Sequence, residues 1–302
     1  MSEPVKYPDL VMPDNVERTK VTVWSLGVPL DADVYRPKGL AENDKVPGIA
    51  LTHGWGGDKK TAERYAAKFA ASGMICISLT QSSWYGSAGT LVPVDSVPET
   101  EQGEELTLKV RPTREVVDPI DWVQNFRACF DYLCGEANVD TDRLGAWGTS
   151  YGGGTAAYAT ATDSRIKALT IQVPMLFDIP EPFREVAQLR ATQIARGEIN
   201  AIPQGIDPYG TMSGTPNLAR MLQYNISEQA AKVSVPTLIV DAGNEEMFDI
   251  RQSGGAVHEV LKAKESVPTY YEVIEGIDHY GIYFDGFERG SQLQHDWFVK
   301  YL

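Results

Sequence analysis

The chain has 302 residues, 43% of them hydrophobic, which is enough for a sizeable buried core in one large domain or two ordinary ones. The formal net charge of −14 makes the surface repel phosphate backbones and anionic lipid, and this argues against a nucleic-acid partner. The sequence has no run of about 18 apolar residues, so it predicts no membrane span and no membrane partner.

The N-terminus lacks the basic segment and the apolar core of a secretory signal, so we expect a cytoplasmic protein. The three cysteines, Cys76, Cys129 and Cys134, are odd in number and have no framework spacing. Such a set predicts free thiols in a reducing compartment, and a packing role for each of them.

Alternating strand and helix patterns run through most of the chain. Residues 20–25 and 30–36 predict an antiparallel pair of strands around Gly27 and Pro29. Apolar runs then alternate with helical spacing, which predicts a mostly parallel sheet with helices on both faces. The further strands are expected at 46–52, 74–79, 143–147, 165–173, 236–241 and 268–274, and the helices at 59–72, 119–134, 151–162, 250–264 and 286–301.

Two segments interrupt this alternation. Residues 80–117 form a long connection, rich in Ser, Gly and Pro and then in acids, which we expect to be irregular and either functional or mobile. Residues 174–232 hold helical stretches near 181–197 and 216–232, joined by a Gly/Pro-rich link. We therefore expect one domain over residues 1–302, with 174–232 inserted as a cap over the site.

The sharpest motif is Gly148-Thr149-Ser150-Tyr151-Gly152, which lies between a predicted strand and a predicted helix. A serine hydroxyl is a weak nucleophile, and it must be exposed at a tight turn beside a base. Small residues two positions to either side let the strand and the helix approach closely at such a turn. The helix that follows directs its N-terminal dipole at the site, where it favours a developing anion. The motif predicts that Ser150 is a nucleophile.

In this context the chain resembles the α/β-hydrolase superfamily, from its first predicted strand to its C-terminus, with the cap least matched. It is most similar to the branch of dienelactone hydrolases, acetyl esterases and the catalytic domains of prolyl-oligopeptidase-type peptidases. The phrase LDADVYRP, residues 30–37, resembles the second strand of that branch. The resemblance implies a serine hydrolase with an α/β-hydrolase fold.

The segment from His53 to Gly57 resembles the His-Gly loop that forms half of the oxyanion hole in this superfamily. The mechanism needs two backbone N–H groups aimed at the tetrahedral oxyanion. Tyr151 N–H, directly after the nucleophile, is the natural first donor, and Trp55 N–H is our choice for the second. We expect His53 to order this loop. A dinucleotide-binding reading of the loop is disfavoured because Lys59 stands where the third glycine belongs.

The general base should follow the serine and the acid in the chain order of this superfamily. The sequence has four histidines, of which His53 precedes the serine, while His258 and His295 lie on predicted helices. His279 ends the stretch Gly276-Ile277-Asp278-His279, which resembles the superfamily's histidine loop. We therefore expect His279 to be the base.

The acid of the triad must orient the imidazole and stabilise its protonated form. The resemblance places it just past the strand at 236–241, which points to Glu245, although Asp is more usual in the family. Glu246 and Asp178 stay open as alternatives, and Asp241 is expected to be structural. The pocket is expected to be apolar and aromatic. Its expected residues are Trp84, Tyr85, Met175, Phe177, Phe248 and Tyr280.

These motifs together predict a carboxylic ester or lactone hydrolase that acts on a small-molecule acyl substrate through an acyl-enzyme on Ser150. No cofactor is expected, and no His/Cys cluster has the spacing of a metal site. Two alternatives stay open: an exo-peptidase or amidase, and a non-hydrolytic member with lyase or C–C cleaving chemistry. The short segment before the core favours the ester or lactone. The sequence leaves the oligomeric state open, a homo-oligomer included.

Overall fold

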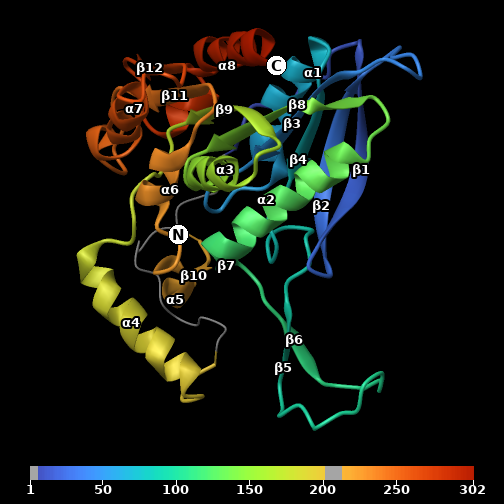
Figure 1. Ribbon diagram of the computed structural model, residues 1–302, viewed down its shortest axis with the longest axis vertical. Helices are drawn as coiled ribbons and strands as arrows, with labels where there is room; N and C mark the ends of the chain where they lie inside the picture. Colours follow the sequence, from blue (N-terminus) through green and yellow to red (C-terminus); the bar gives the residue numbers. More distant parts are fainter. Residues whose placement is uncertain (1–5, 201–212) are drawn as a thin grey trace.

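The computed structural model describes residues 6–200 and 213–302, and within them an eight-stranded sheet forms the centre of the molecule (Figure 1). Its strand order is β1-β2-β4-β3-β8-β9-β11-β12. β2 is antiparallel to both of its neighbours, and every pairing from β4 to β12 is parallel. The strands are β1 (Val16–Ser25), β2 (Val28–Pro37), β3 (Val46–Thr52), β4 (Ile75–Leu79), β8 (Val139–Thr149), β9 (Ile166–Gln172), β11 (Thr237–Ala242) and β12 (Thr269–Ile274).

Helices cover both faces of this sheet, as the alternating pattern predicts. On one face, the aromatic stripe of α2 packs with small residues of α3 and with α6 and α7. On the other face, Phe69 of α1 meets Phe298 of α8 edge to face, with ring centroids 5.4 Å apart. The helices are α1 (Glu63–Ala71), α2 (Pro119–Cys134), α3 (Tyr151–Thr162), α6 (Ile226–Lys232), α7 (Gly254–Lys262) and α8 (Phe287–Tyr301).

The sequence of α2 explains its bounds. Asp118 caps the helix by accepting from the N–H groups of Ile120 and Asp121, and Pro119 occupies the first turn, where its missing N–H costs nothing. The stripe that contains Phe126 and Phe130 is fully buried, and each such side chain contributes about 1.5–3 kcal/mol on burial. The expected helices at 119–134 and 151–162 are confirmed to the residue.

Other expected elements differ at their ends or are divided. The strand expected at 143–147 extends over Val139–Thr149 because the sheet pairs it on both sides. The helix expected at 59–72 begins as a 3-10 turn, η1 (Lys59–Ala62), before α1. The stretch expected at 216–232 is broken into α5 (Leu218–Met221) and α6, because Asn225 adopts a left-handed backbone with φ of 41°.

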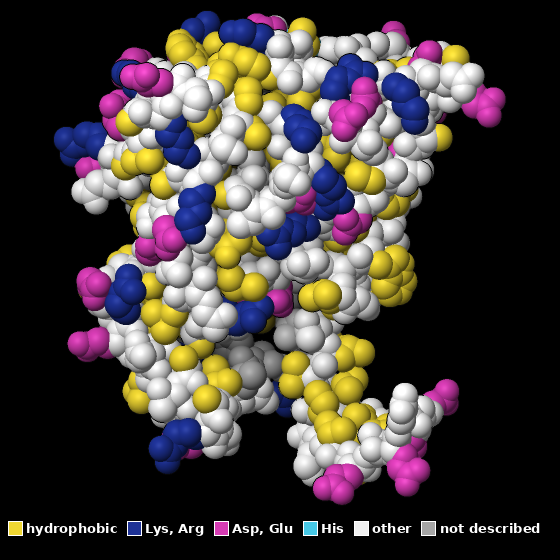
Figure 2. All heavy atoms as spheres, in the orientation of Figure 1, with side chains coloured by type: hydrophobic (Ala, Val, Ile, Leu, Met, Phe, Trp, Pro, Cys, Tyr) yellow, Lys and Arg dark blue, Asp and Glu magenta, His cyan; other side chains and the backbone are white. Residues whose placement is uncertain are grey.

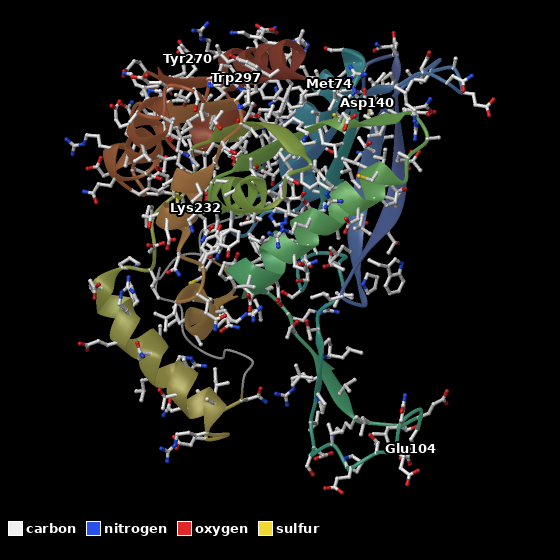
Figure 3. The ribbon with its side chains drawn as sticks, in the orientation of Figure 1. Met74, Glu104, Asp140, Lys232, Tyr270 and Trp297 are labelled. Atoms are coloured by element: carbon white, nitrogen blue, oxygen red, sulfur yellow. The ribbon has the colours of Figure 1, made fainter. Side chains whose placement is uncertain are left out.

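The segment 80–117 is not irregular throughout, and this corrects the expectation. It contains the hairpin β5 (Leu91–Pro93) and β6 (Val110–Pro112), which projects from the body and has Glu104 near its far end (Figures 1 and 3). We call residues 89–114 the arm. A ladder of three residue pairs is too short to give a period-two signal in the sequence. Near its base, β7 (Val116–Val117) pairs with β10 (Thr215–Pro216).

The arm exposes apolar side chains, with acidic ones toward its tip (Figure 2). Leu91, for example, is 62% exposed. An isolated two-stranded hairpin is marginally stable in water, so the arm depends on its base for its structure. The exposed large apolar residues of the arm are Leu91, Val94, Val97, Leu106, Leu108 and Val110.

The segment expected to form a cap holds α4 (Glu181–Ala195), β10, α5 and α6, and its residues 201–212 lie outside the described residues. α5 is fastened to the N-terminus of α2, because Arg220 forms ion pairs of 3.2 Å with Asp118 and 2.9 Å with Asp121. α4 lies against α5 and buries Ala187 there. Within the described residues, none of the helices has the length and apolar character needed to span a membrane.

Candidate active site

Ser150 lies at the sharp turn between β8 and α3. Its backbone has φ of 54° and ψ of −126°, a conformation that L-residues rarely adopt and that is typical of strained functional turns. The turn is held because Ser150 N–H donates to Gln172 O at 3.0 Å, and Met175 N–H donates to Ser150 O at 3.1 Å. A Cβ on Gly152 would lie 2.2 Å from His53 O, so only glycine permits this approach.

A continuous chain of hydrogen bonds joins Ser150, His279 and Glu245. His279 Nε2 lies 3.0 Å from Ser150 Oγ, and His279 Nδ1 lies 2.7 Å from Glu245 Oε2. The side chains of His279 and Glu245 are each 2% exposed. Because a carboxylate only accepts, Nδ1 carries the proton of this bond, and the neutral imidazole then accepts from the serine hydroxyl at Nε2.

The strand order brings these three residues together. Ser150 follows β8, Glu245 lies in the loop after β11, and His279 lies in the loop after β12. The carboxyl ends of neighbouring parallel strands meet at one edge of a sheet, so residues 129 positions apart in the chain become hydrogen-bond partners.

The structure separates the three carboxylates considered for the acid. Glu245 contacts the imidazole, whereas Glu246 Oε2 accepts from the main-chain N–H of His279 at 2.9 Å. Asp178 accepts from the N–H and hydroxyl of Ser227 at the start of α6, at 3.2 and 2.5 Å. The neighbouring glutamates therefore hold two different parts of the same histidine.

Asp241 is buried at the end of β11 and accepts from the Tyr271 hydroxyl at 2.9 Å. Burial, followed by the nearby charge of Glu245, raises the pKa of Asp241 to about 7, although the Tyr271 hydrogen bond opposes this. It does not contact His279 in the structure, which is consistent with the structural role expected for it.

The loop from His53 packs directly against Ser150. A Cβ on Gly54 would lie 2.7 Å from Ser150 Cβ and 3.2 Å from Ser150 Oγ, so the backbone here can approach the Ser150 hydroxyl only as glycine. Tyr151 is the first residue of α3, so its N–H lies at the N-terminus of that helix. The Trp55 and Tyr151 rings meet edge to face at 5.4 Å.

His53 holds the loop together, as the sequence predicts. Its Nε2 accepts from Gln81 N–H at 3.0 Å, so Nδ1 carries the proton and donates to Gly54 O at 2.7 Å. Burial lowers the pKa of His53 to about 4, only partly offset by the Gly54 hydrogen bond, and the ring stays neutral at pH 7. Its ring nitrogens are occupied by backbone groups and not by Ser150.

An apolar cluster lies over the Ser150 turn, between the body and the helices α4 and α5. The expected pocket residues Trp84 and Met175 are buried in it, and Phe177 and Phe248 are partly buried against it. The other members are Trp55, Val117, Trp122, Tyr151, Ile179, Ala187, Leu218 and Met221, with Phe183 and Leu222 partly buried against them.

Aromatic rings continue from this cluster to the histidine. The ring centroids of Phe177 and Phe248 are 5.6 Å apart, those of Phe248 and His279 are 5.7 Å apart, and those of His279 and Tyr280 are 5.4 Å apart. Tyr85, expected in the pocket, is instead 54% exposed and lines surface grooves beside Gly86.

Sequence reasoning missed several residues of this region. Trp122 appeared only as part of the apolar stripe of a helix, yet its ring meets Tyr151 at 5.5 Å and His53 at 5.4 Å. Gln172 gave no signal at all, although its carbonyl holds Ser150 N–H. An apolar stripe on a helix indicates which residues are buried but not which residues they contact, so no local sequence pattern could predict these contacts.

Within the described residues, no group of three or more His, Cys, Asp or Glu side chains is placed to bind a metal ion. The three cysteines are free thiols, and Cys76 and Cys129 are buried. Burial raises the pKa of both of these thiols, so they remain protonated packing residues, as the sequence predicts.

Comparison with known proteins gives the family. The family model described as X-Pro dipeptidyl-peptidase (S15 family) matches residues 27–202, more than half of the chain. The chain belongs to the X-Pro dipeptidyl-peptidase (S15) family. The match covers Ser150 and the His53 loop of this S15 member, while Glu245 and His279 lie beyond it.

Some relatives of this S15 member match nearly its whole length. An Escherichia coli protein described as an uncharacterized 31.7 kDa protein in the traX-finO intergenic region is 27% identical, covering 94% of this chain and all of its own. The solved structure of hypothetical protein PA2218 from Pseudomonas aeruginosa has a TM-score of 0.70 at 17% identity, covering 99% of this chain and 100% of that one.

A dienelactone hydrolase from Anabaena variabilis superposes with a TM-score of 0.57 at 15% identity, covering 95% of this chain and 99% of that one. At these identities the solved structures show the fold alone. Together with the sheet order, they confirm the predicted α/β-hydrolase fold. The S15 member is therefore a protein of the hydrolase superfamily.

Proposed function

We propose that the protein is a serine hydrolase that cleaves a carboxylic ester or lactone through an acyl-enzyme on Ser150. The observation that supports this most directly is the unbroken series of hydrogen bonds from Ser150 Oγ through His279 to Glu245. A nucleophile, a base and a group that orients the base are the three parts that activate a serine hydroxyl.

In the proposed acylation step, Ser150 Oγ attacks the acyl carbon while its proton passes to His279 Nε2. The imidazolium that forms is stabilised by Glu245, which already accepts from Nδ1 at 2.7 Å. The negative charge on the former carbonyl oxygen is stabilised by the N–H groups of Tyr151 and Trp55. Each such donor is worth about 2.7–4 kcal/mol of barrier.

Collapse of the tetrahedral intermediate breaks the bond to the leaving group, and His279 Nε2 returns the proton to the departing oxygen. Water then attacks the acyl-enzyme with His279 as base, and Ser150 is regenerated as the acid product leaves. Every proton in this cycle moves through His279, so this mechanism requires no cofactor.

The surroundings of Ser150 support a neutral, largely apolar acyl substrate of small-molecule size. The cluster around Trp55, Trp122 and Tyr151 offers apolar surface, which binds neutral groups by burial. The carboxylates near the site are already engaged: Glu245 and Glu246 hold His279, and Asp118 holds Arg220. The three free thiols also support our proposal of a cytoplasmic location.

An exo-peptidase acting on X-Pro peptides is the second candidate, favoured by the family that the chain belongs to. Such an enzyme must bind the ammonium group of a peptide N-terminus, and a carboxylate is the natural partner for that charge. Because the nearby carboxylates already have partners, we favour the ester or lactone.

A fluorophosphonate probe tests the proposal. The wild-type protein should be labelled on Ser150, and Ser150→Ala should abolish both labelling and hydrolysis of p-nitrophenyl acetate while the protein stays folded. Comparing that ester with Gly-Pro-p-nitroanilide separates the two candidates. Turnover of the anilide well above that of the ester would favour the peptidase, and absence of labelling would reject the serine mechanism.

A further inference from the structure

A buried hydrogen-bond network lies behind the nucleophile, on the side of the sheet that α1 and α8 cover. Its members are fully or almost fully buried and come from five separate parts of the chain. They are Trp147 and Thr149 of β8, Gln172 of β9, Tyr65 of α1, Gln294 of α8, and Ile282 and Tyr283 of η3 (Tyr280–Tyr283).

The chemistry of the donors fixes the direction of this network. Trp147 Nε1 can only donate, and it donates to Gln294 Oε1 at 2.8 Å. The amide nitrogen of Gln294 therefore donates to Gln172 Oε1 at 2.9 Å. The oxygen of Gln172 is thus an acceptor, and its amide nitrogen is left to donate elsewhere.

The amide nitrogen of Gln172 donates to two hydroxyls, Tyr65 Oη at 3.0 Å and Thr149 Oγ1 at 3.3 Å. Tyr65 in turn donates to the carbonyl of Ile282 at 3.1 Å. Thr149 Oγ1 and Tyr283 Oη lie 2.5 Å apart and share a hydrogen bond. Each polar side chain of the network thus has a partner, as buried networks require.

The two ends of this network are next to the two reacting residues. Thr149 directly precedes Ser150, and Gln172 holds Ser150 N–H through its carbonyl. Tyr283 lies one 3-10 turn after His279, in the short helix that begins beside the imidazole. The Thr149–Tyr283 bond joins residues 134 positions apart, so it ties the serine turn to the histidine loop.

We propose that Thr149 and Tyr283 are positioning residues that set the distance between Ser150 Oγ and His279 Nε2. This role rests on the proposed function of Ser150 and His279. Burial raises the pKa of Tyr283 above its ordinary value, so its hydroxyl remains neutral and keeps the bond intact over the working pH range.

Isosteric variants remove this bond with little change in shape. Thr149→Val and Tyr283→Phe should each lower kcat for p-nitrophenyl acetate by about tenfold to a hundredfold, with KM within about twofold of wild type, because small misplacements of reacting groups cost rate rather than binding. Thr149→Ser keeps the hydroxyl and should restore most of kcat. Thr160→Val serves as the matched control, since it removes a buried hydroxyl that bonds Ala156 O on α3 outside the network.

The double variant tests whether the Thr149–Tyr283 bond is responsible for the loss of kcat in both single variants. Thr149→Val combined with Tyr283→Phe should be no slower than the slower single variant, because both remove the same interaction. Unchanged kcat in the Tyr283→Phe variant, multiplied effects in the double variant, or an equal loss in Thr160→Val would each overturn the proposal. Should Thr149→Val fail to fold, the comparison of Tyr283→Phe with wild type decides.

Labelling by the fluorophosphonate probe separates this proposal from the proposed function. If Ser150 is labelled in the wild type and labelled more slowly in Tyr283→Phe, the serine mechanism and the positioning role are both supported. Equal labelling rates would overturn the positioning role while leaving the serine mechanism in place. Absence of labelling in the wild type would reject the mechanism, and the positioning role with it.

Discussion

The turn that bears Ser150 and the arm at residues 89–114 represent opposite ways of building a connection between elements. The turn is short, strained and buried, and it is held by hydrogen bonds to β9 and packed against the His53 loop. The arm is long, projects from the body and exposes six large apolar side chains (Figures 2 and 3).

The comparison shows which connection of this fold is held in a fixed geometry. Strain at Ser150 persists because the sheet and the buried network around it leave the backbone no alternative. The arm has three paired residues per strand and few buried contacts, so its conformation contributes little to the stability of the body. We therefore expect substitutions at the turn to affect chemistry, and substitutions in the arm to affect neither chemistry nor stability strongly.

The largest effect should come from the pair Glu245 and Glu246. Glu245→Gln should lower kcat by about 10⁴-fold, because an amide can hold the imidazole in the wrong tautomer and cannot stabilise its charge. Glu246→Gln should keep most activity, since an amide oxygen still accepts from His279 N–H. Steady-state kinetics on p-nitrophenyl acetate checks this, and a loss of similar size in both variants would contradict it.

Gly54→Ala should have the next largest effect. The added Cβ would lie 2.7 Å from Ser150 Cβ, so the loop must shift away from the reacting hydroxyl. We expect kcat to fall about a hundredfold while the protein stays folded. Gly39→Ala is the control. A side chain at its φ of +82° costs about 1–2 kcal/mol of stability, but the added Cβ would have no atom within 4 Å and would not contact the site. Full activity in Gly54→Ala would be the contradicting result.

The buried Asp241 gives a pH-dependent effect on stability. Its pKa is raised to about 7, so the folded protein keeps a proton that the unfolded chain releases above its ordinary pKa of 3.8. The stabilisation is therefore present at low pH and is lost as the pH rises through about 7. The free energy of unfolding of Asp241→Asn, measured relative to wild type, should therefore increase as the pH rises from 4 to 8, by on the order of 4 kcal/mol at most.

Urea unfolding at several pH values measures this difference. Asp249 supplies a control of opposite sign, since its hydrogen bond with Arg251 lowers the pKa of its carboxyl. The difference between Asp249→Asn and wild type should therefore change in the reverse direction, and only below about pH 4, where this carboxyl titrates. A difference between Asp241→Asn and wild type that does not vary with pH would show that folding does not raise the pKa of Asp241.

The smallest effect is expected in the arm. Leu91→Ser and Leu108→Ser change exposed side chains, so each should alter the free energy of unfolding by less than about 0.5 kcal/mol. Phe126→Ala, in the fully buried stripe of α2, should cost about 3–5 kcal/mol by contrast. A loss above about 1 kcal/mol in either arm variant would indicate that the arm is covered in solution.

The sequence by itself determined the fold class and predicted a nucleophile and a base, because each has a local or ordered signature. Ser150 stands in a five-residue motif, His279 follows the last strand, and the alternation of apolar runs with helical spacing predicts the parallel sheet. These signals extend over neighbouring residues or depend only on chain order, and a sequence displays both directly.

Only the tertiary structure decided which glutamate contacts the imidazole and which residues support the turn. Glu245 and Glu246 are adjacent and chemically identical, and they differ only in where the loop directs each carboxylate. The bond between Gln172 and Gln294 joins residues 122 positions apart. Contacts of this kind arise when the sheet closes and the helices pack on it, so no pattern within a single segment can show them.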